Sequence, residues 1–317
     1  MIVVTGGAGF IGSNLVQALN ARGCDDILVV EDLSDGHKCV NLASARIADY
    51  FDRDEWLALI RSNNGRDLGI ECVYHLGACS DTTHWDGRAM MENNFSYSRA
   101  IFDYCTNHGI ALVYASSAAV YGKGTRTRFS EEPAFEHPLN VYGYSKLAFD
   151  QYVRHKLPSI DSLVAGLRYF NVYGPREQHK GRMASVALHL HRQLEQDGRV
   201  RLFGASHGYA AGEQRRDFVH VDDVVDITLW LGAQLPSWAG IYNCGTGRAE
   251  PFNAIADAVL AFHGRGALEY IDFPADLADA YQAYTEADLA RLRAAGYAKP
   301  LRDVATGVRE YLSWLSS

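Results

Sequence analysis

The sequence of 317 residues lacks an excess of positive charge. Its 30 lysines and arginines face 38 aspartates and glutamates, which gives a net charge of −8. Sequence-independent nucleic-acid binding needs clustered positive charge, so we expect no nucleic-acid partner. A local basic pocket for an anionic small molecule stays compatible with this balance. With 48% hydrophobic and 21% charged residues, the composition is that of a globular chain and excludes disorder.

Long apolar runs and paired cysteines are also missing. No stretch of 18 apolar residues occurs, and the opening MIVVTGGAGF has neither the basic nor the apolar segment of a signal peptide. The six cysteines are scattered, with no CxxC pair and no histidine at metal-ligand spacing. We therefore expect reduced thiols, no metal centre, no membrane partner and a cytoplasmic location.

Short apolar runs alternate with longer segments of helical period in the first half of the chain. The expected strands are 2–4, 27–30, 72–76, 111–115 and 163–167, and the expected helices are 11–21, 54–62, 88–108 and 141–157. Strands that are apolar on both faces and alternate with helices predict a parallel sheet wrapped by helices. The expected fold class is therefore α/β, with a doubly wound parallel (Rossmann) sheet in residues 1–170.

The pattern of expected strands and helices changes after about residue 170. Shorter strand-like pieces and several helical stretches predict a smaller, mixed α/β substrate lobe over residues 171–317, with some segments returning to the sheet. No Ser- or Pro-rich linker separates the two parts. The sequence contains no internal repeat. The stretch 207–214 (HGYAAGEQ) is small, polar and glycine-containing, so we expect a mobile surface loop there.

A glycine-rich turn follows the first predicted strand directly and opens a helix. Its sequence, TGGAGFIG at positions 5–12, contains Gly6, Gly9 and Gly12. Glycines let the backbone approach a pyrophosphate, and the helix N-terminus offers N–H groups and a positive dipole to the phosphates. The strand–turn–helix setting makes this a dinucleotide-binding prediction.

Acidic and basic residues near the second strand bear on the form of the dinucleotide. Glu31 and Asp32 end that strand, where an acidic residue usually accepts from the ribose 2′-hydroxyl and favours NAD. Lys38 and Arg53 lie downstream, and either could neutralise a 2′-phosphate. The choice between NAD and NADP stays open on these physical grounds.

Tyr142 and Lys146 form a YxxxK pair that lies one turn apart on a single helix face. Ser117 follows the strand at 111–115, at the strand end where such sheets bind ligands. A phenol with a pKa near 10 is a poor base, but a neighbouring ammonium and a cationic nicotinamide ring would lower that pKa. Tyr142 could then take a proton from an alcohol while hydride leaves to the nicotinamide, with Ser117 bonded to the same oxygen and Lys146 holding the ribose.

Together these motifs resemble the extended short-chain dehydrogenases/reductases, the class that modifies nucleotide sugars. The segments RYFNVYGP at 168–175 and RDFVHVDD at 216–223 are similar to stretches of the same class, and the resemblance spans essentially the whole chain. Members that remove water carry an acid–acid pair directly after the catalytic Ser or Thr. Ala118 and Ala119 occupy those positions, so we expect no 4,6-dehydratase chemistry.

Further stretches resemble the epimerases of ADP-heptose within this class: HLGACSDTT at 75–83, PREQHKG at 175–181, and YQAYT at 281–285 ahead of LRAAGY at 292–297. The resemblance implies inversion at C6″ of ADP-heptose through a transient 6″-ketone, for synthesis of the lipopolysaccharide core. It also implies tightly bound NADP, a homo-oligomer (a pentamer in that family), and Lys180 as a second proton-transfer group. The alternatives are a UDP-hexose 4-epimerase and a non-catalytic sensor, although a sensor would need none of the Ser, Tyr and Lys set.

The resemblance also implies which residues bind. At the cofactor it places Phe10, Ile11, Glu31, Asp32, Lys38, Arg53, Leu76, Gly77, Ala78, Cys79, Ser80, Asn93, Lys146 and Val172. At the ADP-sugar it places Ser117, Asn171, Arg182, His189, Phe203, Gly204, Ala205, Ser206, Arg216 and Tyr281. Arg216 is physically apt there, because a guanidinium can grip a diphosphate with two hydrogen bonds. The chain departs from the family in having Glu31–Asp32 for the commoner Asp-Asn, Arg182 for a small residue, and a longer 207–214 stretch.

Overall fold

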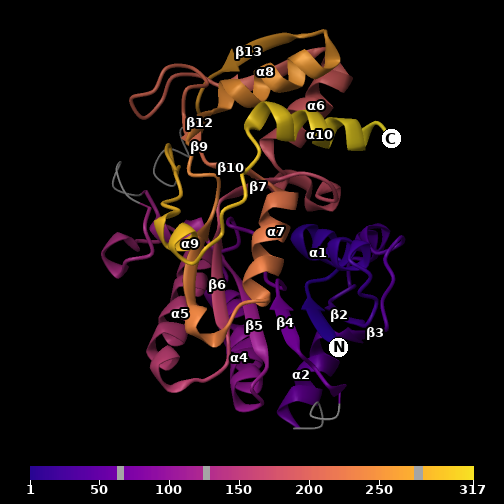
Figure 1. Cartoon of the computed structure of the whole chain (residues 1–317). Helices are drawn as coiled ribbons and strands as arrows, with labels where there is room; N and C mark the ends of the chain where they lie inside the picture. The colour runs from indigo at the N-terminus through magenta and orange to yellow at the C-terminus, as the bar shows by residue number, and fades with distance from the viewer. Residues whose placement is uncertain (63–67, 124–128, 275–280) are drawn as a thin grey trace. The chain divides into compact units, whose positions relative to one another are not determined.

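The structure, a computed structural model, describes residues 1–62, 68–123, 129–274 and 281–317 (Figure 1). It consists of two compact units. The first unit contains residues 1–120, 138–168 and 225–242, and the second contains residues 121–137, 169–224 and 243–317. The predicted division of binding roles at residue 170 stays a prediction. In the described part of the chain, no helix combines the length and apolar character that crossing a membrane needs.

The described residues of the first unit form a seven-stranded sheet with the order β11-β6-β5-β4-β1-β2-β3. Its strands are β1 Ile2–Thr5, β2 Ile27–Glu31, β3 Asp49–Asp52, β4 Cys72–His75, β5 Ala111–Ser117, β6 Val164–Tyr169 and β11 Gly240–Cys244. β1 pairs in parallel with both β2 and β4. The strands β2 and β3 follow on one side of β1, and β4, β5 and β6 follow on the other, so the strand order reverses at β1. Ligands bind at such a reversal in doubly wound sheets. The predicted α/β class is confirmed.

Helices cover both faces of this sheet. They are α1 Phe10–Ala21, α2 Arg53–Arg61, α3 Gly87–Met91, α4 Tyr97–Asn107, α5 Val141–Lys156 and α7 Val221–Gly232. On one face, Trp56 of α2, Phe102 of α4 and Phe149 of α5 pack in a single core with Val73 of β4. The next residue, Tyr74, lies against Gly232 of α7, where a Cβ would overlap the tyrosine ring. Side chains alternate across a strand, so α7 covers the opposite face.

Two features of the first unit differ from the sequence prediction. The helix expected at 88–108 is interrupted by a π-helical turn, η3 (Glu92–Ser96), between α3 and α4, so the prediction of one continuous helix is wrong. The sequence prediction does not include the strand β3, because Asp49 and Tyr50 are exposed at the sheet edge and carry no apolar run. A periodic apolar pattern reveals buried strands and helices, but it does not reveal an exposed strand at the edge of a sheet.

The second unit is built from short strand pairs and helices. Its strands are β7 Asn171–Tyr173, β8 Arg199–Phe203, β9 Arg215–Arg216, β10 Phe218–His220, β12 Glu250–Pro251 and β13 Ala267–Ile271, and its helices are α6 Val186–Asp197, α8 Phe252–His263, α9 Ala290–Ala294 and α10 Val304–Leu315. Leu190 of α6, Ile255 of α8 and Val308 of α10 share one core with Val200 of β8. That core supports the β7–β10 and β8–β13 pairs.

Short 3-10 turns connect these elements in both units. They are η1 Gly36–Asn41, η4 Ala118–Tyr121, η5 Pro133–Phe135, η6 Leu157–Ser159, η7 Gln178–Met183 and η8 Pro236–Trp238.

Candidate active site

The glycine turn between β1 and α1 is as tight as the sequence predicts. Gly6 has a φ of +69°, and a Cβ there would lie 2.6 Å from the backbone nitrogen of Gly77. A Cβ at Gly12 would overlap the carbonyl oxygen of Gly6. Gly9 is the N-cap of α1 and offers no side chain to its first turn. Glycine at 6 and 12 therefore permits the backbone of the turn to pack closely on itself and on the segment after β4, and Gly9 places no side chain at the N-terminus of α1, where phosphates bind in such folds.

The Glu31 carboxylate is used within the protein. Its Oε2 accepts the Ala8 backbone N–H at 3.0 Å, while its Oε1 accepts the Asp32 backbone N–H at 3.0 Å and the Lys38 ammonium at 3.0 Å. Lys38 Nζ also lies 2.6 Å from the Asp32 carbonyl oxygen. Glu31 thus ties the glycine turn to the end of β2, and it compensates part of the Lys38 charge.

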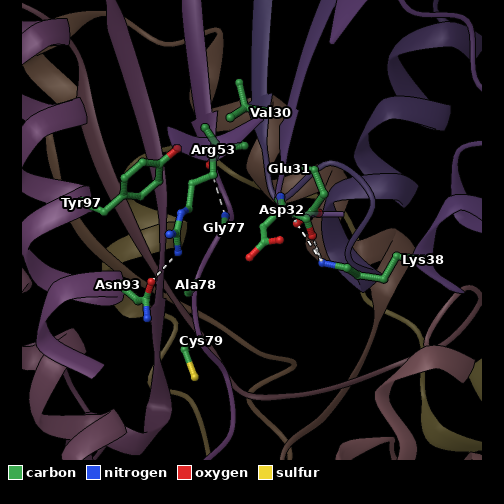
Figure 2. Close-up of a pocket in the computed structure, with 12 residues that line it drawn as sticks. Val30, Glu31, Asp32, Lys38, Arg53, Gly77, Ala78, Cys79, Asn93 and Tyr97 are labelled. Carbon is green, nitrogen blue, oxygen red and sulfur yellow. Dashed lines mark hydrogen bonds and ion pairs between the residues drawn. The ribbon is translucent and has the colours of Figure 1, made fainter. Parts of the chain in front are cut away.

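A cavity of about 210 Å³ opens at the carboxyl ends of β1, β2 and β4. Its lining includes these predicted cofactor residues: Gly6, Glu31, Asp32, Lys38, Arg53, Gly77, Ala78, Cys79 and Asn93. Figure 2 shows the Asp32 carboxylate directed into the cavity between the Arg53 and Lys38 sides. Hydrogen bonds from Ser34 hold the Asp32 pKa below its usual range. The cavity lining therefore combines the Asp32 carboxylate with two cations, Lys38 and Arg53.

The π-helical turn η3 shapes one wall of this cavity. Asn93 on η3 accepts a hydrogen bond from Arg53 Nη1 at 2.5 Å (Figure 2). The next residue, Asn94, is fully buried, and it accepts the Cys79 N–H at 2.8 Å and donates to the Cys79 carbonyl at 2.9 Å. Asn94 Nδ2 also lies 3.0 Å from Ser145 Oγ on α5. One amide side chain thus joins the segment after β4 to α5. π-turns of this kind are frequent at functional sites.

Ser117, Tyr142 and Lys146 lie together in the first unit. Ser117 is the last residue of β5, and Tyr142 and Lys146 stand one turn apart on α5. Burial raises the pKa of Tyr142, and a hydrogen bond with Ser117 opposes that rise. Lys146 is buried and donates to the Ala115 carbonyl at 2.9 Å, and burial lowers its pKa to about 8. The group supplies a hydroxyl, a phenol and an ammonium of lowered basicity.

Asn140 and Gly143 hold the start of α5 against the segment after β5. The Asn140 side chain accepts the Gly143 N–H at 2.8 Å and caps the helix. A Cβ at Gly143 would lie 2.7 Å from the Ala119 carbonyl oxygen. Glycine at 143 therefore permits the close approach that brings Tyr142 to Ser117.

Lys180 lies in the second unit, on the turn η7. Its side chain is half-buried, and burial lowers its pKa while the Glu177 charge opposes the decrease. Glu177 is fully buried and accepts the Ser185 backbone N–H and Ser185 Oγ, each at 2.6 Å. The turn that carries Lys180 is thus fixed at its base by a buried carboxylate.

Arg216 and Tyr281 form a contact within the second unit. The Arg216 guanidinium is 4.9 Å from the centroid of the Tyr281 ring and 5.7 Å from that of Phe252. Arg216 is buried, and burial lowers its pKa to about 10. A buried cation held between two rings is suited to an anionic ligand, because desolvation strengthens the attraction.

The other predicted substrate residues are also found in the second unit. Asn171 begins β7 and is exposed, Arg182 is exposed on η7, and His189 on α6 lies 3.3 Å from the Arg182 carbonyl oxygen. Phe203 ends β8, and the residues that follow it are Gly204, Ala205 and Ser206. Val172, predicted at the cofactor, lies on β7.

The cavity in the first unit contains residues that the sequence prediction omits. They are Thr5, Val30 and Tyr97. Thr5 directly follows the predicted strand 2–4 and Val30 ends the predicted strand 27–30, so the position at a strand end could have indicated them. Tyr97 is the first residue of α4, and nothing in the sequence around it indicates that it lines a cavity.

The first unit fits a nicotinamide dinucleotide by its own geometry. The glycine turn packs tightly on backbone at Gly6, Gly9 and Gly12 and leads directly into the N-terminus of α1, where a pyrophosphate binds in such folds. The cavity at the ends of β1, β2 and β4 offers the Asp32 carboxylate and the Arg53 guanidinium to an adenosine ribose. Phe10, Ile11, Leu76 and Ser80 flank these segments in sequence.

Comparisons with known proteins agree with this geometry. A profile of the NAD dependent epimerase/dehydratase family matches residues 2–245. The chain is 60% identical over 313 residues to ADP-L-glycero-D-manno-heptose-6-epimerase of Alkalilimnicola ehrlichii, covering 98% of this chain and 96% of that protein.

Two solved structures are similar over nearly the whole chain. The Helicobacter pylori ADP-L-glycero-D-manno-heptose-6-epimerase superposes with a TM-score of 0.82 at 30% identity, covering 100% of this chain and 96% of that one. The Thermus thermophilus UDP-glucose 4-epimerase, solved with NAD, superposes with a TM-score of 0.80 at 26% identity, covering 100% and 99%. The predicted resemblance to nucleotide-sugar enzymes with a nicotinamide cofactor is confirmed, and the chain belongs to the NAD dependent epimerase/dehydratase family.

Proposed function

We propose that this chain converts ADP-D-glycero-D-manno-heptose to its L-glycero epimer at C6″, a step toward the lipopolysaccharide core. The observation that carries the proposal is the 60% identity with the Alkalilimnicola ehrlichii 6-epimerase over 98% of the chain. Ser117, Tyr142 and Lys146 supply the groups that such a reaction needs. Ala118 and Ala119 follow Ser117, so the acid–acid pair of the dehydratases is absent from those positions.

The route follows from the chemistry of the substrate carbon. C6″ bears an alcohol and has no adjacent carbonyl to acidify its hydrogen, so direct deprotonation at carbon is closed. A nicotinamide cofactor, when bound, supplies a reversible acceptor for the hydrogen and electron pair of C6″. Tyr142 takes the hydroxyl proton while Ser117 donates a hydrogen bond to the same oxygen, which leaves a 6″-ketone on the sugar. The ketone reorients, the hydride that the cofactor would have accepted would be returned to the opposite face of C6″, and a protein group gives a proton to the ketone oxygen, so the alcohol re-forms in the opposite configuration.

Inversion needs a proton-transfer group for each of the two orientations of the sugar. We assign Tyr142 to one orientation and Lys180 to the other. A lysine acts as a base near neutral pH only when its pKa is lowered, and burial lowers the pKa of Lys180. Replacing Lys180 with methionine should therefore abolish epimerisation, whereas the Arg182→Met change on the same turn should mainly alter KM.

The remaining binding roles are extensions of the same proposal. Arg216 and Tyr281 hold the ADP diphosphate and its neighbouring ribose or base, supported by the buried position of the guanidinium. Lys38 and Arg53 favour NADP over NAD, and Lys146 binds the nicotinamide ribose.

We also propose that the protein forms a homo-oligomer, a pentamer, and works in the cytoplasm. Sedimentation equilibrium of the purified protein tests the oligomeric state.

The function is tested by proton NMR of ADP-D-glycero-D-manno-heptose mixed with purified protein and no added nucleotide. We expect a mixture of the two epimers, because the cofactor ends as it began and stays bound. UDP-galactose serves as the control substrate and should remain unchanged. Absence of heptose conversion even after NADP is added, together with conversion of UDP-galactose, would replace this proposal with a UDP-hexose 4-epimerase.

A further inference from the structure

A buried set of polar side chains lies beside Lys146, and the chemistry above does not use it. Asp150 on α5 and Arg168 on β6 are fully buried, with Arg168 Nε and Nη2 each 2.9 Å from Asp150 Oδ2. The Tyr114 hydroxyl donates to Asp150 Oδ1 at 2.9 Å, and Ser116 Oγ donates to Asp150 Oδ2 at 2.9 Å. One carboxylate on α5 therefore binds three side chains from β5 and β6.

The position of these bonds along β5 connects them to Lys146. Tyr114 and Ser116 stand directly before and after Ala115, the residue whose carbonyl accepts the Lys146 ammonium at 2.9 Å. Lys146 and Asp150 are four residues apart on α5, so they share one face of the helix. The carboxylate thus fixes the strand on both sides of the carbonyl that holds the ammonium. Ser117, the next residue of β5, moves with the same strand.

Stability alone gives a weak reason for this ion pair. Burying two charges carries a desolvation cost, and apolar residues of similar volume are often as stable or more stable at such positions. Asp150 in the middle of α5 binds Tyr114 and Ser116 near the active-site end of β5, so the pair has another role available, which is to set geometry. The distance from Tyr142 to Ser117 also depends on the fit of these two elements.

We propose that Asp150 and Arg168 are positioning residues, which hold β5 against α5 so that the Ala115 carbonyl keeps the Lys146 ammonium in place for catalysis. This inference rests on the proposed function for the role of Lys146. Both side chains are fully buried, and the proposal gives them no contact with substrate or cofactor. Their effect passes through Tyr114, Ala115 and Ser116 to the ammonium and the phenol.

The charges around Lys146 give this role an electrostatic signature. Asp150 and Cys79 oppose the decrease that burial causes in the Lys146 pKa. His75 also faces Lys146, but burial lowers its pKa to about 3, so it is neutral. Tyr142 shares the helix, and Arg168 sits beyond Asp150. Removing the Asp150 charge alone takes away an attraction that favours the Lys146 ammonium, so the pKa of Lys146 should fall further.

The main test is the near-isosteric double variant Asp150→Asn with Arg168→Met, measured as holoenzyme. It removes both charges and leaves an amide oxygen to accept from β5. We expect kcat to fall roughly tenfold to a hundredfold at unchanged KM for the ADP-sugar, the size of effect that small misplacements cause. The affinity of stripped protein for NADP should fall as well. A kcat within twofold of wild type and an unchanged NADP affinity would show that the pair is only structural.

Two further variants test the proposal if the double variant does not fold. Ser116→Ala removes one bond and leaves the ion pair intact, and we expect a lower kcat with little change in thermal midpoint. Asp150→Asn alone should move the alkaline fall of kcat to lower pH, and an unmoved profile would overturn the proposal. The matched control is Tyr152→Phe, which lies on α5 like Asp150; it removes the 2.6 Å bond to Asp103 of α4 and should leave kcat unchanged.

The outcomes separate this inference from the proposed function. Absence of epimerisation by the wild-type protein counts against the proposed function alone. NADP affinity and thermal midpoint are measurable without any sugar substrate. A loss of NADP affinity in the double variant, with wild-type affinity in Tyr152→Phe, then still supports the positioning role.

Discussion

Tyr142 and its neighbour Tyr144 offer a matched pair on α5. We expect Tyr142→Phe to lower kcat by about 10²- to 10⁴-fold, because it removes the proton acceptor and keeps the ring. Tyr144 is 53% exposed, so Tyr144→Phe should keep wild-type turnover. NMR of the heptose conversion measures both. Wild-type turnover by Tyr142→Phe would exclude the phenol as the base.

Lys146 gives the reaction a predicted pH dependence. Burial lowers its pKa from 10.5 to about 8, so the ammonium loses its proton as the pH rises through that value. The Lys146 charge, which we propose binds the ribose and favours the phenolate, is present below pH 8 and is lost above it. We therefore expect kcat to fall on the alkaline side. Lys146→Arg stays protonated and should lack this fall, although its rate is lower. The same alkaline fall in both proteins would assign it to another group.

Arg53 should decide the preference between NADP and NAD. Its guanidinium bonds to Asn93 at 2.5 Å and to Asp54 at 3.0 Å while facing the cavity. A charged hydrogen bond to a 2′-phosphate contributes about 1.5–3 kcal/mol, so Arg53→Gln should weaken NADP binding by more than tenfold and leave NAD binding unchanged. Isothermal titration with each dinucleotide measures this. Arg61→Gln, at the exposed end of the same helix, is the control.

At the scale of elements, the π-helical turn η3 is the feature that links the cavity of the first unit to α5. Asn94→Ala leaves the Cys79 N–H and C=O without their partner, and each unsatisfied buried group costs about 1–3 kcal/mol. We expect the free energy of unfolding in urea to fall by that order and cofactor affinity to fall with it. Glu92→Ala changes an exposed residue of the same turn and should affect neither. Equal effects of the two changes would contradict the assigned role of Asn94.

The elements also show what the sequence could predict about the fold. The buried strands β1, β2, β4 and β5 have apolar runs, and the structure places them within one or two residues of the predicted bounds. The edge strand β3 and the π-turn η3 lack such a signal. β3 is held by pairing with β2, and η3 by the contacts of Asn94 with the segment after β4. Both depend on partners that are distant in the chain.

At the scale of the whole molecule, cofactor binding should raise stability by mass action. NADP at about 100 times its Kd adds about 2.7 kcal/mol to the free energy of unfolding of stripped protein, if the unfolded chain does not bind it. Thermal scans with and without NADP measure the shift. Gly12→Ala places a Cβ on the Gly6 carbonyl, so its scan should respond far less to NADP. An equal response in the two proteins would place the cofactor elsewhere.

The sequence by itself determined the features that depend on short spacing. The glycine turn, the YxxxK pair and the alternation of buried strands with helices each lie within a few residues, and local backbone geometry fixes their relation. The tertiary structure alone decided how distant side chains are used. In the folded chain Glu31 accepts hydrogen bonds from Ala8 and Lys38, and Asn94 accepts one from Cys79. Asp150 accepts hydrogen bonds from Tyr114, Ser116 and Arg168. These contacts join separate elements of the fold, so the spacing of residues along the chain does not encode them.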